Sequence, residues 1–434
     1  MIKQLINNQR MFFNSGKTHS LEWRLNALKN LRKAILLHEE NIINALSLDL
    51  KKSAISSKKV EIDQIITEID LHSSQLNQWV KAKKVRTPFI FFPTTSFTVA
   101  QPRGVVLIIS PWNFPFSLTL RPLIGAISAG NCALLKPSEF SPHSSQVIAQ
   151  LINSTFSENY IAVMQGDAQV AQEILTHRFD YIFFTGSTTI GTLVMQAAAQ
   201  HLTPLTLELG GCNPCFVDTE IDLKIAAKRI AWGKFHNAGQ SCLAPNFVAV
   251  DEKIEKKFIE YLIHALKNIY HDPTKIGSII NQFHFERLIQ LLGNKKILHG
   301  GNFDRANLRI EPTVIETDHN DQILRSEIFG PILPIISYQH IDKAIARIHN
   351  QPLAVYLFSN NEILQKKILE TTVSGGVCIN DVGVHYANPH LPFGGVGMSG
   401  FGSYHSKKTF DAFSHFKSVM KRSFWFDWPF RYKI

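Results

Sequence analysis

A single cysteine and a single glutamate stand out in this sequence as residues that could carry out covalent chemistry. Cys242 lies in the segment FHNAGQSCLAP, among small and polar residues rather than in an apolar run, which predicts that it is exposed. A thiol is a strong nucleophile only as its thiolate, and a free cysteine has a pKa of ~8.5, so a reactive one needs positive surroundings or a nearby base. Glu208 is the candidate base, because it lies near the end of the alternating stretch PLTLEL, which Gly210 and Gly211 terminate. A buried, inert cysteine explains the local sequence equally well, so these two residues alone do not decide the chemistry.

Short apolar stretches in the first half of the chain indicate where a ligand would bind. They are about 20 to 30 residues apart with helical segments between them, which predicts a doubly wound parallel sheet with strands at 105–109, 132–135, 161–164 and 181–184. Three of them run into polar tips, PWNF, KPSE and TGST. Ligands of open parallel sheets bind at the carboxyl ends of the strands, so these tips predict one crevice. Gly186 and Ser187, at the start of the next helix, could offer backbone N–H groups to a phosphate.

The second half repeats this alternation and predicts a second α/β domain. Its apolar stretches predict strands at 214–217, 247–250, 332–336, 355–358 and 377–379, and helical patterns cover 224–235 and 253–270. Two further helical patterns, 21–50 and 60–80, open the chain. The segment 87–103 carries three prolines and an alternating stretch, which predicts a loop and an edge hairpin that could leave the main body as an arm. The aromatic cluster at 424–430 needs burial or a partner.

Length and composition narrow the class of protein. A chain of 434 residues with 45% hydrophobic and 18% charged residues is expected to fold into two or three soluble domains. The net charge of +10 favours anionic partners such as nucleotide phosphates, but the basic residues are dispersed, so no nucleic-acid partner is predicted. Five cysteines without framework spacing indicate a reducing compartment, and no apolar run approaches the ~18 residues of a membrane span. A cytoplasmic protein without an integral membrane anchor is therefore expected.

Two short motifs are interpreted as structural. Gly395, Gly397 and Gly400 satisfy GxGxxG, but they follow LPFG rather than an apolar strand, which favours a turn where backbones approach closely. Cys212 and Cys215 form a CxxC without a second pair or a nearby histidine pair, so we predict no metal site.

Seven motifs occur together in one order. They are PWNFP, LLKPSE, FTGST, LELGG, GQSCLAP, EIFGP and PFGGVGMSG. In this order they resemble the aldehyde dehydrogenase superfamily, and most closely its class 3 branch. The resemblance implies an α/β fold with a Rossmann-like parallel-sheet cofactor domain, a second α/β catalytic domain and a small β bridging element. It predicts an NAD(P)-binding domain at 1–80 and 104–206, a catalytic domain at 207–390, and bridging and oligomerisation elements at 81–103 and 410–434.

The resemblance also implies a reaction. A medium- or long-chain aliphatic or an aromatic aldehyde would be oxidised to the carboxylic acid with NAD(P)⁺. Cys242 is expected to attack the aldehyde, the Asn113 side-chain amide and the Cys242 backbone N–H to stabilise the oxyanion, and Glu208 to activate water against the thioester. Two alternatives stay open: acyl transfer or esterase chemistry on the same scaffold, and a non-catalytic basic binding protein. A homodimer formed through the hairpin and the aromatic tail is expected.

Cofactor contacts follow from the same resemblance. It assigns these residues to the NAD(P) site: Lys136, Glu139, Gly186, Ser187, Trp112, Glu327 and Phe329. Lys136 and Glu139 are expected at the adenosine ribose, and Glu139 would repel a 2′-phosphate, which favours NAD while NADP stays possible. The pyrophosphate is expected at residues 186–187. Glu327 is expected at the nicotinamide ribose and Phe329 at the ring.

Overall fold

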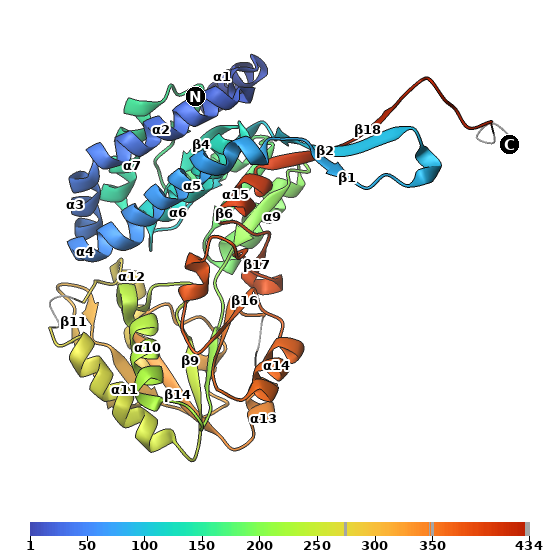
Figure 1. The fold of residues 1–434 in the computed structure, drawn as a ribbon. Coiled ribbons are helices and arrows are strands. Elements are labelled where there is room, and N and C mark those ends of the chain that lie inside the picture. Colours follow the sequence, from blue (N-terminus) through green and yellow to red (C-terminus); the bar gives the residue numbers. More distant parts are fainter. Residues whose placement is uncertain (273–275, 347, 349–350, 430–434) are drawn as a thin grey trace.

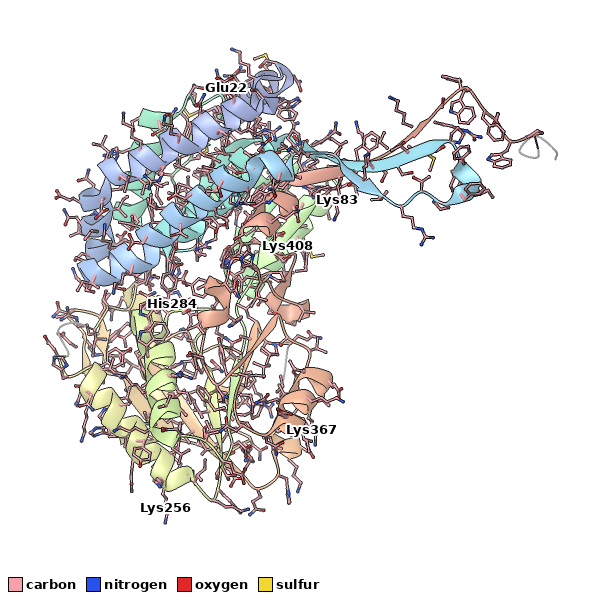
Figure 2. The ribbon with its side chains drawn as sticks, viewed as in Figure 1. Glu22, Lys83, Lys256, His284, Lys367 and Lys408 are labelled. Atoms are coloured by element: carbon pink, nitrogen blue, oxygen red, sulfur yellow. The ribbon has the colours of Figure 1, made fainter. Side chains whose placement is uncertain are left out.

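Two helix-covered β-sheets and an extended arm organise the chain (Figure 1). The computed structural model describes residues 1–272, 276–346, 348 and 351–429. The chain forms most of the first unit, crosses to the second unit after residue 208, and returns to the first unit near residue 400. Figure 2 shows His284 where the two units face one another.

The first sheet is parallel except at one edge. Its strand order is β17-β7-β6-β3-β4-β5, and only β17 is antiparallel to its neighbour. The strands are β3 (Val105–Ile109), β4 (Cys132–Lys136), β5 (Ile161–Val163), β6 (Tyr181–Thr185), β7 (Leu205–Glu208) and β17 (Gly400–Phe401). The four predicted strands of this sheet are confirmed, and their apolar residues are buried because helices cover both faces. Residue 207, where the second domain was predicted to begin, lies inside β7.

Helices from both ends of the chain cover this sheet. Those that contact its strands are α1 (Ile2–Asn14), α6 (Pro115–Ala129), α7 (Pro142–Thr155) and α9 (Thr188–Ala199). Outside α6 and α7 pack α2 (Leu21–Leu37), α3 (Glu39–Leu50) and α5 (Asp63–Trp79), and α15 (Lys407–Ala412) returns to pack on α6. The remaining helices of the unit are α4 (Ala54–Ser56) and α8 (Ala168–Leu175). The predicted 21–50 pattern therefore contains two helices, which meet at His38.

The second sheet has the order β10-β13-β14-β9-β8-β15-β16, and only β10 is antiparallel to its neighbour. Its strands are β8 (Pro214–Val217), β9 (Phe247–Asp251), β10 (Lys296–His299), β13 (Thr313–Glu316), β14 (Ile332–Tyr338), β15 (Ala354–Phe358) and β16 (Gly376–Ile379). Its helices are α10 (Leu223–Phe235), α11 (Glu255–Ile269), α12 (Gln282–Leu292), α13 (Ile341–Ile345) and α14 (Glu362–Thr371), and β11 (Phe303–Asp304) pairs with β12 (Arg309–Ile310) beside it. The five strands predicted for the second half are confirmed.

The arm is a three-stranded antiparallel sheet that extends away from both units (Figure 1). β2 (Thr94–Pro102) lies between β1 (Lys83–Val85) and β18 (Ser414–Arg422). The predicted arm is confirmed, although β2 pairs along its whole length with β18, a strand more than 300 residues later. The exposed apolar residues near its tip are Phe89, Ile90, Phe91, Phe92, Phe424 and Trp425. Residues 430–434 of the predicted bridging element lie outside the described residues.

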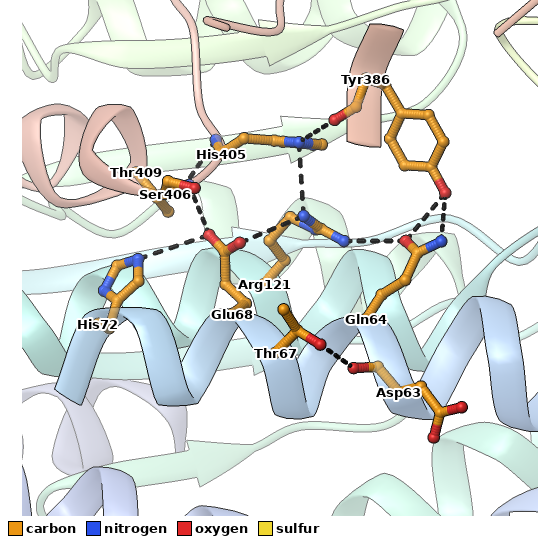
Figure 3. A network of polar contacts seen from close by, with 10 residues as sticks. All are labelled: Asp63, Gln64, Thr67, Glu68, His72, Arg121, Tyr386, His405, Ser406 and Thr409. Carbon is orange, nitrogen blue, oxygen red and sulfur yellow. Dashed lines mark hydrogen bonds and ion pairs between the residues drawn. The ribbon is translucent and has the colours of Figure 1, made fainter. Parts of the chain in front are cut away.

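A buried polar network ties the returning C-terminal segment to the first unit (Figure 3). Glu68 of α5 contacts His72 and Arg121, and it accepts a hydrogen bond of 2.6 Å from the backbone N–H of Ser406. Burial alone would raise the pKa of Glu68, but His72 and Arg121 lower it to about 2. The carboxylate therefore stays charged and holds α5, α6 and the 405–406 turn together.

Candidate active site

Cys242 follows a sharply turned loop between α10 and β9. This loop contains η4 (His236–Gly239), where Asn237 and Ala238 adopt left-handed backbone angles with φ of 55° and 54°. Gly239 has a φ of +71°, and a Cβ there would lie 2.2 Å from the carbonyl oxygen of Gly330. Only glycine fits this close approach, which explains the first residue of GQSC. Three consecutive left-handed residues reverse the chain and bring Cys242 to the edge of the second unit.

Asn213 fixes the backbone of the cysteine loop through hydrogen bonds of its side-chain amide. Its Nδ2 donates to the carbonyl oxygens of Cys242 at 2.6 Å and Ala244 at 3.1 Å, and its Oδ1 accepts from the N–H of Ala354 at 2.9 Å. Asn213 is fully buried, so these bonds satisfy the polar atoms of its amide without water. The loop is thereby fixed to β15. Sequence reasoning missed the role of Asn213. The one available signal was its position inside the CxxC motif, directly after Cys212.

The PWNF tip of β3 meets this loop from the other unit. Asn113 is buried, and its Nδ2 donates to the carbonyl oxygen of Gln240 at 3.2 Å. Its Oδ1 is buried and makes no hydrogen bond to any described residue. The backbone oxygen of Asn113 accepts from Asn237 Nδ2 at 3.0 Å. The structure therefore brings together two motifs that are 127 residues apart.

Glu208 closes the site from the end of β7, where it pairs with Gly400 of β17. Its side chain faces the Cys242 thiol. Burial raises the pKa of Glu208 to about 8, and the nearby Glu327 carboxylate adds to this, while a hydrogen bond from Cys242 opposes it. Glu208 Oε1 has no partner among the residues that the structure describes. Cys242, Glu208 and Asn113 thus converge, as the sequence predicted.

The surroundings of the sulfur differ from the expectation. Cys242 is partly buried and packs against the core of the first unit, so the predicted exposure is wrong. Burial, followed by the Glu208 carboxylate, raises the pKa of Cys242 well above its usual value. Of the two ways to activate a thiol, this site supplies the adjacent base rather than positive surroundings. The polar sequence around Cys242 reflects backbone hydrogen bonding in the loop, not exposure of the thiol.

Glu327 lies against the two glycines that follow Glu208. A Cβ on Gly210 would lie 1.9 Å from Glu327 Oε2, so this glycine is needed for the carboxylate to fit. Burial raises the pKa of Glu327 to about 7, against the opposing effects of a hydrogen bond from Gly211 and the charge of Lys234. Glu327 Oε1 is buried without a partner in the described part of the chain.

Lys136 and Glu139 lie together at the end of β4. Lys136 is buried, and its Nζ donates to the carbonyl oxygen of Pro137 at 2.9 Å and lies 3.4 Å from Glu139 Oε2. The Glu139 side chain is 33% exposed, so its carboxylate still reaches solvent. Lys136 and Glu139, both predicted at the cofactor site, therefore lie next to one another.

The helix start at residues 186–187 differs in part from the prediction. The N–H of Gly186 donates to the carbonyl oxygen of Glu208 at 3.0 Å, because the pairing of β6 with β7 continues one residue past the end of β6. This group is therefore not free for a phosphate. Ser187 caps α9, since its hydroxyl accepts from the N–H of Ile190 at 3.4 Å. Beside them, Thr185 Oγ1 is buried with no hydrogen-bond partner in the described ranges.

Trp112 and Phe329 bring the two units into contact. Their rings lie 5.3 Å apart and almost perpendicular, and Trp112 also lies 5.4 Å from the His284 ring. Figure 2 shows His284 between the units. Phe329 has a φ of 47°, a left-handed conformation that is rare for a bulky residue. These two predicted cofactor residues therefore lie side by side at the interface.

The GxGxxG and CxxC motifs, both interpreted as structural, lie at a close backbone approach and in the buried core. Gly400 has a φ of +112°, and a Cβ there would lie 2.0 Å from the carbonyl oxygen of Leu207, so the glycine-rich segment is a close backbone approach. Cys212 and Cys215 are buried. Among residues 1–272, 276–346, 348 and 351–429, no group of three or more His, Cys, Asp or Glu is placed to hold a metal ion.

Comparison with known proteins decides the family. The family model described as "Aldehyde dehydrogenase family" matches residues 2–419. The chain belongs to the aldehyde dehydrogenase family. This aldehyde dehydrogenase is 42% identical to the mouse "Aldehyde dehydrogenase, dimeric NADP-preferring" over 97% of this chain and 95% of the relative. It is 43% identical to the 4,4'-diaponeurosporen-aldehyde dehydrogenase of Staphylococcus aureus over 98% of this chain and 94% of that relative.

Solved structures agree with the family. The substrate-bound state of Staphylococcus aureus AldH superposes with a TM-score of 0.97 at 42% identity, over 100% of this chain and 98% of that one. The predicted aldehyde dehydrogenase fold is confirmed. As a member of this family, the protein oxidises an aldehyde to the carboxylic acid with NAD(P)⁺. In the described part of the chain, none of the helices is long and apolar enough to cross a membrane.

Proposed function

We propose that Cys242, Glu208 and Asn113 carry out the aldehyde oxidation. The observation that supports this assignment is their convergence: the thiol faces the Glu208 carboxyl group, and Asn113 reaches the cysteine loop through its 3.2 Å bond to Gln240. A nucleophile, a base and an amide donor are the groups that acyl chemistry on sulfur requires. Among the described cysteines, Cys132, Cys212, Cys215 and Cys378 are buried, whereas Cys242 is partly accessible and shares a hydrogen bond with the Glu208 carboxyl group.

In the first step, the Cys242 sulfur forms a bond to the aldehyde carbon and the thiol proton passes to Glu208. The pKa of Cys242 is raised above that of Glu208, so the proton rests on sulfur until the attack. The carbonyl becomes an oxyanion, which Asn113 Nδ2 and the Cys242 N–H stabilise. The 3.2 Å bond from Asn113 to Gln240 is long, so the amide can turn to the oxyanion at little cost.

After the attack, the carbon loses a hydride to form a thioester, and the acyl group is then released to water. NAD(P)⁺, when bound, would supply the acceptor for the hydride that the carbon loses as the carbonyl re-forms on sulfur. Glu208, which has returned its proton to solvent, takes a proton from water as the water oxygen attacks the thioester, and the C–S bond breaks. A base with a pKa of about 8 suits this task near neutral pH. Glu208 also favours hydrolysis over transfer of the acyl group to another acceptor.

The residues at the strand ends fit a dinucleotide. Glu327 Oε1 and Thr185 Oγ1 are buried without partners among the described residues, and a ribose hydroxyl and a phosphate could satisfy them. Lys136, Glu139 and Ser187 would bind the remaining polar groups of the dinucleotide. Trp112 and Phe329 would lie beside its nicotinamide ring. We propose NAD as the preferred cofactor, because the partly exposed Glu139 carboxylate would repel a 2′-phosphate. The NADP preference printed in the name of the mouse relative is the competing expectation.

The substrate that we propose is a medium- or long-chain aliphatic or an aromatic aldehyde. Aromatic rings flank the reacting loop: Phe114 stacks on His236 at 6.2 Å, and Trp232 lies 5.7 Å from His236. Trp232 is 47% exposed, which leaves an apolar surface beside the site.

We also propose a homodimer in the cytoplasm, with 81–103 and 410–434 as the pairing elements. The exposed arm and the word "dimeric" in the name of the mouse relative support the dimer. The five unpaired thiols agree with a reducing compartment. The domain roles at 1–80 with 104–206 and at 207–390 stay predictions.

Steady-state kinetics tests the assignment. We expect the wild-type protein to reduce NAD faster than NADP across a panel of aldehydes, and Cys242→Ala to lose activity by at least about 10³-fold. Cys378→Ala, a buried thiol of the second unit, is the matched control and should retain activity. Unchanged activity in Cys242→Ala would overturn the proposal.

A further inference from the structure

A buried ion pair lies directly behind the Asn113 loop. Lys52 and Glu61 pair with one another, and their side chains are 4% and 0% exposed. Lys52 Nζ also donates to the backbone oxygen of Asn113 at 2.8 Å. Glu61 Oε2 accepts from the backbone N–H of Ser117 at 2.9 Å, in the first turn of α6. One ion pair therefore holds both ends of the segment from Asn113 to Ser117.

Stability alone does not explain this pair. Burying an ammonium and a carboxylate costs free energy that their attraction often fails to repay, and an apolar pair of similar volume can replace such a pair without loss. The charged pair orients the backbone of the 113–117 segment, because each of its two groups has a fixed hydrogen-bond partner there. Lys52 Nζ further lies 4.2 Å from the centre of the Phe114 ring, which fixes the residue next to Asn113 as well.

Unusual backbone conformations bring both residues inward. Lys51, directly before Lys52, has a φ of 53° at the end of α3. Glu61 lies in η2 (Ser57–Ile62), a π-helix of six residues. Left-handed non-glycine residues and π-helical turns are energetically unfavourable and occur most often at functional sites.

The ion pair connects to the cysteine loop through Asn113. The oxygen that accepts from Lys52 also accepts from Asn237 Nδ2 at 3.0 Å. Asn237 Nδ2 in turn lies 3.1 Å from the Gln240 oxygen, to which the Asn113 side chain donates. We propose that Lys52 and Glu61 are positioning residues that orient the Asn113 amide toward the reacting carbonyl. This inference rests on the proposed role of Asn113.

A double-mutant cycle on kcat tests the inference. The variant Lys52→Met/Glu61→Met removes both charges, so no unpaired charge stays buried. In the wild-type background we expect kcat to fall about 100-fold, with KM for NAD(P)⁺ unchanged, since a misplaced donor weakens the transition state and not cofactor binding. In the Asn113→Ala background, the same pair of changes should alter kcat less than about 2-fold, because the group that it positions is already gone.

Several controls separate positioning from folding. Lys58→Met removes a half-exposed lysine of the same π-helix, which pairs with Glu39, and should leave kcat unchanged. Glu61→Gln keeps the shape and an acceptor for Ser117, so it provides a second, milder variant should the double variant unfold on heating; we expect a loss of about 10-fold that also vanishes with Asn113→Ala.

The outcomes distinguish this inference from the proposed function. Equal losses in both backgrounds, or no loss at all, would overturn the positioning role while leaving Cys242, Glu208 and Asn113 in place. Full activity in Asn113→Ala would overturn the role of Asn113 and the inference with it.

Discussion

At the scale of single residues, the proposed mechanism depends on the protonation of one carboxyl group. Glu208 has a pKa raised to about 8 by burial, and only its ionised form can accept a proton from water. We therefore expect kcat to rise with pH, to level off above about pH 8, and to fall as pH drops below it. Glu208→Gln should lower kcat by about 10²- to 10⁴-fold and remove this limb of the pH profile. The profiles of both proteins, measured with one aldehyde, check this expectation.

The same pKa shift predicts a pH-dependent stability. A carboxyl group whose pKa rises from 4.5 to about 8 on folding binds its proton more tightly in the folded state. The stability that it contributes is fully present below pH 4.5 and is lost as pH rises toward 8. Relative to wild type, Glu208→Gln should gain about 1.4 kcal/mol of unfolding free energy per pH unit across this window. Denaturant unfolding at pH 5, 6, 7 and 8 measures the difference, and a constant difference would contradict the burial of Glu208.

The site residues differ in how much of their position the sequence reveals. Cys242, Glu208 and Asn113 were proposed from motifs at the end of a strand or loop, and the structure brings these three residues together. Lys52, Glu61 and Asn213 could not be predicted, because they act through backbone groups of other segments, and no local pattern encodes such contacts. The burial of Cys242 was mispredicted for the same reason, since the walls around it come from distant residues.

At the scale of elements, β17 determines where Glu208 lies. Gly400 pairs with Glu208, has a φ of +112°, and a Cβ there would lie 2.0 Å from the carbonyl oxygen of Leu207. We expect Gly400→Ala to push β7 aside, to lower stability by about 2–4 kcal/mol and to reduce kcat. Gly16→Ala is the matched control, because Gly16 also has a positive φ, of +77°, but has open space around it.

The control should cost only the left-handed conformation, about 1 kcal/mol, with kcat unchanged. Thermal unfolding and steady-state kinetics of both variants provide the comparison. Equal effects of the two substitutions would show that the close approach at Gly400 does not hold Glu208 in place.

Strands with a continuous apolar run could be predicted from the sequence, while strands without such a run could not. Most strands of the two sheets are visible in the sequence because burial on two faces makes them continuous apolar runs. β10, β13 and β17 were not predicted, because a half-exposed edge strand, a strand with only two apolar residues and a two-residue strand have no such run. The domain boundary predicted at 207 lies one residue before the end of β7 at Glu208.

At the scale of the whole molecule, we expect the arm to determine assembly. β18 pairs with β2 over nine residue pairs but leaves most of its side chains exposed, as does β1 at the opposite edge. Unpaired strand edges add strands from other chains, so we expect a homodimer in solution. A chain that ends at residue 413 lacks β18 and should be a monomer.

Light scattering of the full and shortened chains measures the two masses. β18 lies outside both sheets that build the site, so the shortened chain should still oxidise aldehydes. The reduction of NAD in the presence of an aldehyde measures this activity. A monomeric full-length protein would contradict the proposed assembly.

Mass spectrometry of the acyl-enzyme tests the central claim most directly. Glu208→Gln removes the base that we propose releases the acyl group, so incubation with NAD and an aldehyde should leave the acyl group as a thioester on the sulfur of Cys242. We predict that the peptide containing Cys242 gains the mass of the acyl group only when both aldehyde and cofactor are present, and that hydroxylamine removes it. An acyl group on another residue, or an unmodified Cys242 in a variant that still reduces NAD, would contradict the account.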